Sequence, residues 1–446
     1  MGTNSKIRSW ALTVALAGFL FGFDTVVISG ANLPIKNLWN TSPLFHGFFI
    51  MSMALWGTVL GSIFGGIPCD RWGRKKTLLW IGILYAVSAL GSAFAQDPYF
   101  FSFFRFLGGV GVGASSVAAP IYLSEIAPAK NRGNVVAGYQ FMLVFGIFMA
   151  FISNYLLQGF GGENDWRWML GVEAVPALIY CALVVGIPNS PRWLILHQNK
   201  VQEARVILQG MGVNAEIAIK EIQQSVQRNV SGSVFKVKYN YVLMLAFLLA
   251  FFNQLSGINF ILYYAPELLE ISGLAAKDSL FSSISIGGVN LIFTLLGMYL
   301  IDRAGRKQLL VIGSIGYIIS LGLVAYGFYS DASSTFLLSF ILLFIASHAI
   351  GQGAIIWVFI SEIFPTQVRA QGQSFGTATH WVLAAMITLV TPYFLDSTDG
   401  IFKDNPWPIF AFFAVFMVLQ LIFALFIMPE TKGKTLEELK TMLVKE

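Results

Sequence analysis

The stretch Asp70-Arg71-Trp72-Gly73-Arg74-Lys75 lies between two apolar segments and returns 232 residues later as Asp302-Arg303-Ala304-Gly305-Arg306-Lys307. Two further motifs recur in the same order, at similar spacings of 237 and 241 residues. They are Ser124-Glu125-Ile126-Ala127-Pro128 with Arg132, repeated as Ser361-Glu362-Ile363-Phe364-Pro365 with Arg369, and Pro188-Asn189-Ser190-Pro191, echoed by Pro429-Glu430-Thr431. Three ordered pairs at nearly one offset indicate a duplicated chain.

Apolar segments of about 20 residues or slightly more separate these motifs, as membrane spans require. Of the 446 residues, 56% are hydrophobic and 11% are charged, and the mean hydropathy is +0.70. Soluble domains carry about 25% charged residues, so the composition excludes a soluble protein. Each span must be a helix, because hydrocarbon offers the backbone no hydrogen-bond partner. We expect twelve, near residues 9–30, 45–68, 77–96, 99–124, 134–157, 167–188, 241–269, 279–301, 308–328, 336–361, 370–394 and 407–428.

The repeats and spans together predict an all-α membrane protein with twelve transmembrane helices in two pseudo-symmetric halves of six. Residues 1–188 form the first half and residues 239–446 form the second half with a short cytoplasmic tail. The polar stretch 189–238 shows helical patterning with mixed charge and predicts short cytoplasmic helices between the halves. Parallel repeats imply a pseudo-two-fold axis along the membrane normal, with the substrate near the midplane.

Basic residues orient membrane helices, so their distribution matters more than the net charge of +5. With the N-terminus inside, cytoplasmic segments hold 23 of the 28 Lys and Arg. We therefore expect both termini in the cytoplasm and no nucleic-acid partner. No small-residue cleavage site follows the basic N-terminus, so no cleaved signal peptide is expected. Two cysteines in the whole chain exclude a disulfide scaffold.

Three ionisable residues stand out within predicted spans, where an ionised side chain costs at least roughly 2.5–3.5 kcal/mol. They are Asp24 in the first span, Arg105 in the fourth and Glu173 in the sixth. One base beside two acids predicts a titratable cluster, and because arginine stays charged the proton must bind a carboxylate. Protonated Asp24 would weaken its hold on Arg105 and shift the balance between two conformations. The alternatives are a permanent ion pair that only joins two helices, and an interfacial Glu173.

Uncharged polar residues gather in other spans. The seventh span carries Asn253, Gln254, Ser256 and Asn259, and single polar or aromatic residues elsewhere are Gln140, Asn290, Trp357, His380 and Trp381. Amides offer donors and acceptors without charge, and aromatic faces stack on C–H surfaces, which together suit a neutral polyhydroxylated ligand. The alternative is hydrogen bonding between helices, worth about 0.6–2 kcal/mol for each pair.

Motifs for other classes of function are absent from the sequence. Gly109-Val110-Gly111-Val112-Gly113 follows no strand and indicates close helix packing rather than a nucleotide site. No Gly-x-x-x-x-Gly-Lys-Ser/Thr loop occurs, so the chain carries no phosphate loop of its own for ATP-driven transport. No nucleophile–base pair and no metal-ligand spacing appears, at His380 or elsewhere, so we expect no enzyme, no cofactor and no metal site.

Over nearly its whole length the sequence resembles the sugar porter family of the major facilitator superfamily, and within it the bacterial xylose–proton symporters. The motifs that carry the resemblance are Phe21-Gly22-Phe23-Asp24, Asp70-Arg71-Trp72-Gly73-Arg74-Lys75, Tyr122-Leu123-Ser124-Glu125-Ile126-Ala127-Pro128 with Arg132-Gly133, Pro188-Asn189-Ser190-Pro191-Arg192-Trp193-Leu194, Gln254-Leu255-Ser256-Gly257-Ile258-Asn259 with Tyr263-Tyr264, Ser361-Glu362-Ile363-Phe364-Pro365 and Pro429-Glu430-Thr431-Lys432-Gly433.

The resemblance implies roles for individual residues. Asp24, Arg105 and Glu173 match the acid–base groups of the proton-coupled members. The sugar would be bound by Phe21, Gln140, Gln254, Asn259, Asn290, Trp357, His380 and Trp381. Tyr263 would close the outer gate. A cytoplasmic lock would use Arg74, Glu125, Arg132, Arg306, Glu362 and Arg369.

The sequence departs from the family pattern at four places. Asn253 replaces the first Gln of a Gln-Gln pair, and His380 stands where Asn or Gln is common. Asn189 replaces a Glu, so one cytoplasmic ion pair is missing. The segment 351–357 lacks the family's prolines, so the tenth helix is expected to hinge differently.

These observations predict alternating-access uptake of a monosaccharide (D-xylose, D-glucose or a similar hexose or pentose) coupled to proton symport. The expected place is the inner membrane of a bacterial cell, and the expected state is a multi-pass monomer in the lipid bilayer. Two alternatives remain: a passive uniporter, in which the Asp24–Arg105 pair is structural, and a sugar sensor. The sensor is disfavoured because the chain ends about 17 residues after the last predicted span.

Overall fold

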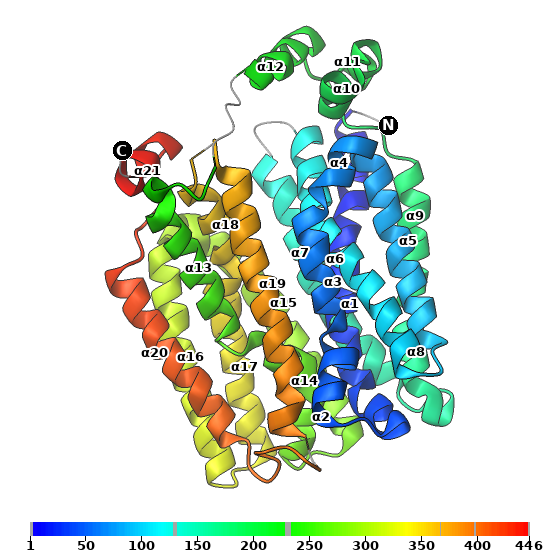
Figure 1. Cartoon of the computed structure of the whole chain (residues 1–446), viewed down its shortest axis with the longest axis vertical. Helices are drawn as coiled ribbons and strands as arrows, with labels where there is room; N and C mark the ends of the chain where they lie inside the picture. Colours follow the sequence, from blue (N-terminus) through cyan, green and yellow to red (C-terminus); the bar gives the residue numbers. More distant parts are fainter. Residues whose placement is uncertain (1–2, 128–131, 228–232, 366, 397, 445–446) are drawn as a thin grey trace.

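The computed structural model describes residues 3–127, 132–227, 233–365, 367–396 and 398–444. Two bundles of long helices lie side by side, and shorter helices cover one end of them (Figure 1). No β-strand occurs in the described ranges. The all-α prediction is therefore confirmed.

The first bundle uses the N-terminal part of the chain. Its helices are α1 (Thr3–Trp39), α2 (Pro43–Phe45), η1 (His46–Met51), α3 (Met53–Phe64), α4 (Gly66–Trp72), α5 (Arg74–Ala93), α6 (Pro98–Ile126), α7 (Arg132–Leu157), η3 (Gly162–Asn164), α8 (Asp165–Gly171) and α9 (Ala174–Val185). The segments Pro43–Met51 and Met53–Phe64 form one broken span, bent by 42°.

The second bundle uses the C-terminal part. Its helices are η4 (Val237–Tyr239), α13 (Asn240–Gln254), α14 (Ile258–Ile271), α15 (Ala276–Ala304), α16 (Arg306–Tyr329), α17 (Ser334–Ile350), α18 (Gln352–Ile363), α19 (Arg369–Leu395) and α20 (Trp407–Phe426). Four short helices lie outside both bundles: α10 (Pro191–Gln198), α11 (Val201–Gly210), α12 (Ala215–Gln227) and α21 (Leu436–Leu443).

Both chain ends and α10 to α12 lie at the same end of the molecule, here called the tail end (Figure 1). The opposite end, which carries α2 and the loops after α7 and α19, is called the distal end. Eleven described helices are long and apolar enough to cross a membrane, or twelve if the bent pair counts as one span. The predicted count of twelve spans is therefore confirmed, whereas the division at residues 188 and 239 stays a prediction.

Several spans differ in detail from the predicted ones. The first helix continues nine residues past the predicted end at residue 30, and reaches Trp39. The seventh span is two helices, because Gly257 adopts a φ of +85° that no right-handed helix accommodates. The tenth span is likewise broken at Gly351, where ψ is −105°. The sixth is divided between α8 and α9, next to Glu173. Breaks in spans are tolerated where protein surrounds the freed backbone groups.

Within the first bundle, α3 and α6 approach so closely that only glycine fits between them. A Cβ on Gly109 would lie 1.8 Å from the carbonyl oxygen of Ala54, and a Cβ on Gly61 would lie 2.3 Å from that of Val110. Small residues at helix contacts are the usual means of close packing in membranes, where no hydrophobic force drives helices together. The glycine-rich stretch 109–113 therefore packs helices, as the sequence indicated.

We expect Gly109→Ala to destabilise the first bundle by roughly 1–3 kcal/mol, because the new methyl group must push two backbones apart. Gly138→Ala is the matched control, since nothing lies within 4 Å of a Cβ at Gly138 on α7. Alanine should there stabilise the helix by about 0.5–1 kcal/mol. Thermal unfolding of both purified variants in detergent checks this. Equal melting temperatures for the two variants would contradict the packing argument.

Long helices of the two bundles meet where α1 packs against α14, α3 against α19, and α7 against α15, and the short helices α2 and η1 also contact α19. Side chains from both bundles therefore meet at these contacts. The rings of Phe21 on α1 and Trp381 on α19 lie 5.6 Å apart by their centroids. The candidate sugar-binding residues thus come together between the two bundles.

Candidate substrate and proton site

Asp24 and Arg105 form a buried ion pair in the first bundle. Arg105 donates from Nη1 to Asp24 Oδ1 at 2.6 Å and from Nη2 to the Asp24 backbone oxygen at 3.2 Å. Both side chains are 2% exposed. An acid of α1 thus lies against a base of α6, 81 residues away.

Glu173 completes this cluster from the break between α8 and α9. Its side chain is 1% exposed, and both Asp24 and Arg105 lie close enough to act on it electrostatically. Two carboxyl groups beside one guanidinium have no net charge when one of the carboxyls is protonated and the other is ionised. Like charges in contact cannot both stay ionised at low cost, so one carboxyl carries that proton. The arrangement can therefore hold one exchangeable proton.

Tyr263 approaches the ion pair from the second bundle. It lies on α14, is 1% exposed, and acts electrostatically on both Asp24 and Arg105. The neighbouring Tyr264 has non-helical backbone angles and donates its hydroxyl to the backbone oxygen of Thr388 at 2.8 Å. The kinked segment of α14 is thus attached to α19 while Tyr263 covers the acid–base cluster.

The amides of the seventh span form a connected set on the second bundle. Asn259 donates from Nδ2 to Gln254 Oε1 at 2.8 Å, across the break at Gly257. The Gln254 amide nitrogen lies 3.1 Å from a ring nitrogen of His380 and donates to Asn253 Oδ1 at 2.9 Å. The helix break is what lets two residues five apart face the same side, so the predicted pair is brought together.

Aromatic rings line the same place. The ring of His380 lies 4.9 Å from that of Trp357 and 4.7 Å from that of Trp381, measured between centroids. The indole N–H of Trp381 has no hydrogen-bond partner in the described part of the chain, although it is buried. A donor without a partner beside three amides is available to a hydroxylated ligand.

Two predicted sugar-binding residues are not joined to this set. Asn290 on α15 accepts a hydrogen bond of 3.4 Å from Thr294 of its own helix. Gln140 on α7 is half-buried, and no hydrogen bond links it to the other amides within the described ranges. Gln140 lies on α7 of the first bundle, and Asn290 lies on α15, the helix of the second bundle that packs against α7.

The predicted lock residues at the tail end pair inside each half. Arg74 bonds Glu125 and Asp70, and at the matching repeat positions Arg306 bonds Glu362 and Asp302. Arg369 donates to the backbone oxygen of Phe364, and the side chain of Arg132 lies outside the described part. The ion pairs of Arg74 and of Arg306 thus each stay within one bundle.

Glu430 supplies a tail-end contact that was not predicted. Burial alone would raise its pKa, but backbone N–H groups of Lys432, Arg306 and Lys307 donate to its carboxylate and hold the pKa below its usual value. At the matching position in the first half, Asn189 reaches only Glu203, at 3.5 Å. The repeat motif Pro429-Glu430-Thr431 was therefore a signal for this cap of α16.

At the distal end, four residues join the bundles in contacts that sequence reasoning missed. Lys36 on α1 forms an ion pair with Asp396, which follows α19. Asn32 donates to Glu267 on α14 at 2.7 Å and contacts His46 Nε2 through its own oxygen, also at 2.7 Å. Lys36 is one of few basic residues outside the cytoplasmic segments, which was the one signal available. We call Asn32, Lys36, Glu267 and Asp396 the distal lock.

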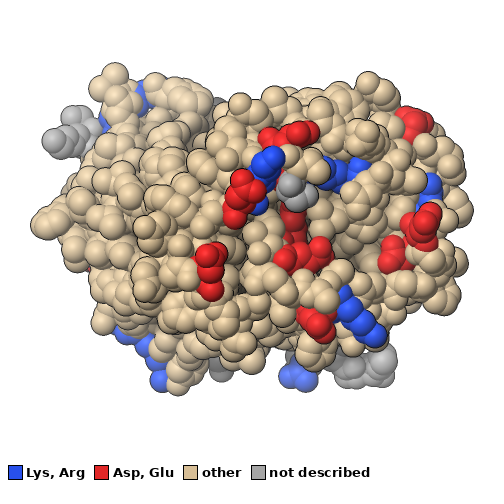
Figure 2. All heavy atoms as spheres, turned by 90° about the horizontal axis from the view of Figure 1, so that it is seen from below, with Lys and Arg blue, Asp and Glu red and all other residues tan. Residues whose placement is uncertain are grey.

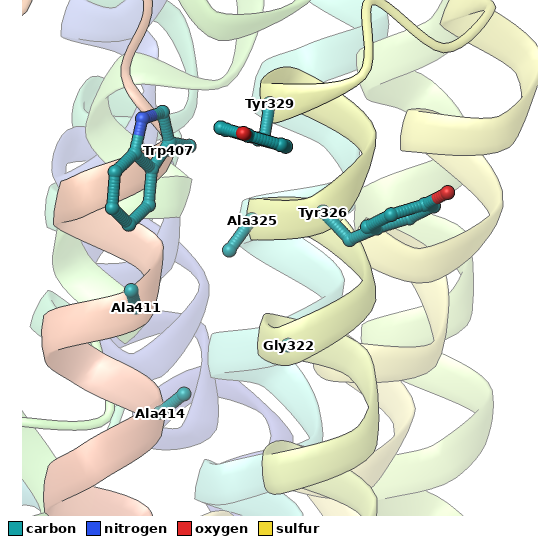
Figure 3. Close-up of a pocket in the computed structure, with 7 residues that line it drawn as sticks. All are labelled: Gly322, Ala325, Tyr326, Tyr329, Trp407, Ala411 and Ala414. Carbon is teal, nitrogen blue, oxygen red and sulfur yellow. The ribbon is translucent and has the colours of Figure 1, made fainter.

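A surface groove lies elsewhere, between α16 and α20 (Figure 3). It encloses about 400 Å³ and is lined by Gly322, Ala325, Tyr326, Tyr329, Trp407, Ala411 and Ala414. Its floor of glycine and alanine offers no side-chain donor or acceptor, and its tyrosines are largely exposed. It is an apolar groove on the outer surface, and it is separate from the site between the bundles.

Comparison with known proteins agrees with this geometry. A family model described as "Sugar (and other) transporter" matches residues 10–443. The chain belongs to this family. Sugar transporters of this kind are membrane proteins and not enzymes. The resemblance to sugar porters that the motifs indicated is therefore confirmed.

Two curated sugar transporters of the family are similar over nearly their whole length. The arabinose-proton symporter of Bacillus subtilis is 35% identical over 443 residues, which cover 96% of this chain and 93% of that protein. The D-xylose-proton symporter of Escherichia coli K12 is 31% identical over 481 aligned positions, covering 98% of this chain and 96% of that one.

A solved structure matches the whole sugar transporter fold. The inward open conformation of the xylose transporter XylE from E. coli superposes with a TM-score of 0.86 and 31% identity, and the match covers 98% of this chain and all of that one. The two-bundle architecture is thus the major facilitator fold.

Proposed function

We propose that this sugar transporter takes up a monosaccharide together with a proton by alternating access. The observation that carries the proposal is the buried Asp24–Arg105–Glu173 cluster, which lies beside the amide and aromatic site and is covered by Tyr263. Relatives named as proton symporters for arabinose and xylose support the coupling.

The coupling follows from the charges of the cluster. When Asp24 is ionised, the guanidinium of Arg105 is held at 2.6 Å. A proton on Asp24 removes this charge–charge attraction, so Arg105 is free to turn and the helices α1 and α6 can shift relative to each other. When Asp24 is ionised, Glu173 holds the proton instead. The transporter changes conformation when it carries both the proton and a sugar bound between the bundles.

The sugar is bound by Gln254, Asn259, Asn290 and His380 on the wall of the second bundle and by Gln140 on the wall of the first bundle. Hydroxyl groups pair with the amides, and C–H faces stack on the aromatic residues Phe21, Trp357 and Trp381. The two walls belong to different bundles, so bound sugar contacts both only when the bundles close around it. One chain supplies the whole site, and the proposed working unit is therefore a monomer.

We infer that the tail end faces the cytoplasm of a bacterial cell. Loops of the distal end carry more acidic than basic residues, and Figure 2 shows Asp and Glu scattered over this face together with some Lys and Arg. The basic residues concentrate in the tail-end segments, as orientation in the membrane requires. Both termini are then cytoplasmic, the distal end faces outside, and the closed distal lock makes this an inward-facing state.

The deciding experiment measures uptake of labelled xylose, arabinose, glucose, galactose and fructose into proteoliposomes with an inward proton gradient, and again with protonophore. We expect one of these sugars to accumulate above equilibrium and protonophore to abolish the accumulation. Equilibration without accumulation, whatever the gradient, would show a uniporter and would reduce the Asp24–Arg105 pair to a helix contact.

Gln254→Ala is expected to raise the half-saturating sugar concentration about 10- to 100-fold. A lost sugar hydrogen bond costs about 0.5–1.5 kcal/mol, and Asn259 left without its partner costs about 1–3 kcal/mol more. Exchange of labelled sugar across vesicles at equal pH measures this. Gln96→Ala, at an exposed distal position, is the control and should bind sugar as the parent does. Unchanged affinity in Gln254→Ala would remove this amide from the site.

A further inference from the structure

Helix α5 carries a line of buried polar residues that none of the functions described so far uses. Tyr85, Ser88 and Ser92 follow one another at spacings of three and four residues, which places them on one face of the helix. Each is at most 1% exposed. Their three hydroxyl oxygens have no hydrogen-bond partner within the described part of the chain. We call these three residues the α5 seam.

The seam faces the proton cluster. Helix α5 packs against α6, which carries Arg105, and against α9, which begins directly after Glu173. A methyl group on Gly108 of α6 would meet Ser88 Oγ at 2.3 Å and Asp24 Oδ1 at 3.6 Å, so both oxygens border the same glycine. Asp24 and Glu173 also act electrostatically on Tyr85.

Polar atoms of the cluster are unpartnered in the same place. Arg105 Nε, Glu173 Oε1 and Tyr180 Oη also lack a hydrogen-bond partner among the described residues. A buried polar group without a partner costs about 1–3 kcal/mol, and bound water is the usual means by which proteins satisfy several such groups at once. Six donors and acceptors on three facing helices therefore make a polar lining suited to ordered water.

The internal repeat provides a control inside the same molecule. Tyr85 and Ser88 correspond, at the offset of 232 residues, to Tyr317 and Ser320 on α16. There the tyrosine hydroxyl pairs with His348 Nδ1 at 2.5 Å, and the serine donates to the backbone oxygen of Gly316 at 2.7 Å. The same two side chains are satisfied in the half without the carboxyl pair and unsatisfied in the half that contains it.

The seam also leads towards the distal end. Ser92 is the penultimate residue of α5, and just beyond it Arg167 caps the backbone oxygens of Ala93 and Ala95. From Tyr85 to Ser92 the helix rises by about 10 Å, at roughly 1.5 Å per residue. The elements that α5 contacts, namely α1, α4, α6, α8 and α9, all belong to the first bundle. The seam therefore lies apart from the sugar cavity between the bundles.

We propose that the α5 seam binds a chain of water molecules and conducts protons between the outside and the Asp24–Glu173 carboxyl pair, separately from the path of the sugar. A hydronium ion at the distal end passes its proton to the first water, each water forms one O–H bond as it gives up another, and a carboxylate oxygen accepts the last proton. The inference rests on the proposed proton coupling.

The ionisable groups that face the seam are Asp24 on α1, Arg105 on α6, Tyr139 on α7, and Glu173 and Tyr180 at α9. Tyr263 covers the cluster from the second bundle while the distal lock is closed. A separate water route would let the carboxyls exchange protons with the outside before the sugar gate opens.

The test compares the double variant S88A/S92A with the parent in proteoliposomes. Sugar-driven proton entry, read with a pH dye inside the vesicles, should fall at least fivefold. Exchange of labelled sugar at equal acidic pH should stay within twofold, because exchange needs no new proton. Ser320→Ala, the repeat equivalent of Ser88, should leave both rates unchanged. Equal losses of proton entry and of exchange would indicate a packing role and overturn the proposal, as would a double variant that keeps the parent's proton rate.

Hydroxyl-radical footprinting of the unmodified transporter gives a second, independent measurement. Radicals formed from bound water should oxidise Tyr85 despite its full burial, whereas its repeat equivalent Tyr317 should stay protected. Protection of both tyrosines would overturn the proposal even if the serine variants failed to fold. A parent that shows no sugar-driven proton entry at all would instead contradict the proposed symport, and this outcome is visible before any variant is made.

Discussion

Asp24→Asn is expected to abolish accumulation of sugar against its gradient while sugar exchange continues at a rate within a few-fold of the parent. Asparagine keeps the shape of the side chain and can still accept a hydrogen bond from Arg105, but it carries no charge and binds no proton in this pH range. The variant is fixed in the equivalent of the protonated form. The proton gradient then no longer contributes to the direction of transport.

The measurement is the ratio of internal to external sugar at steady state, followed by counterflow in the same vesicles. We expect a ratio near one and intact counterflow. Glu173→Gln is the companion variant and should slow net uptake without removing coupling, because Asp24 can still take up the proton. Accumulation that survives in Asp24→Asn would assign the proton to another group and leave the ion pair as a structural contact.

Lys36→Ala is expected to open the distal lock and shift the transporter towards the outward-facing state. Lys36 is 12% exposed and Asp396 is 1% exposed, so the variant leaves a carboxylate buried without its cation in the closed state. Removing one partner of such a pair costs roughly 3 kcal/mol, which is more than a hundredfold in the equilibrium between closed and open. The open state loses little, because water solvates the carboxylate there.

Spin labels at Gln96→Cys and Tyr329→Cys, in a background without Cys69 and Cys181, report the opening as a longer distance across the distal end. The double variant Lys36→Asp with Asp396→Lys restores the pair with its polarity reversed and should close the end again. An unchanged distance in Lys36→Ala would show that the lock contributes nothing to the closed state.

The Lys36–Asp396 pair of the lock should also resist acid. Burial alone would raise the pKa of Asp396, but the hydrogen bonds from Lys36, from Thr398 and from the backbone of Asp399 outweigh it and lower the pKa to about 2. A carboxylate with a lowered pKa stabilises the closed state above its ordinary value of 3.8 and loses this effect only as the pH falls towards 2. The stabilisation of the closed state by the Lys36–Asp396 pair is therefore constant between pH 5 and 8. Titration of this pair should not change the label distances measured across that range.

Sequence patterns predicted the spans and the Asp24–Arg105 contact because both follow from strong local physics. Hydrophobic length decides a span, and a charge at bilayer depth must find a partner. The breaks at Gly257 and Gly351 were harder to predict, because many glycines in membrane helices serve packing instead, as Gly109 does. Whether a glycine bends a helix or admits a neighbour depends on what lies opposite, which no local window contains.

The distal lock and the α5 seam escaped prediction for a related reason. Lys36 and Asp396 are 360 residues apart, and each lies near a loop where a charged residue needs no explanation. Serine in a membrane helix usually bonds its own backbone, as Ser320 does, so Ser88 carries no visible signal in the sequence. The tail-end lock between the halves stays a prediction, since the structure pairs Arg74 and Arg306 with carboxylates of their own halves.

The closed distal end makes the two faces of the membrane unequal for a ligand. If the empty carrier spends most of its time closed to the outside, an external sugar meets a competent site only in the small open fraction, and its apparent dissociation constant is the intrinsic one divided by that fraction. A sugar approaching from the cytoplasm carries no such penalty. Measured affinities should therefore be weaker in right-side-out than in inside-out vesicles, and Lys36→Ala should bring the two values together.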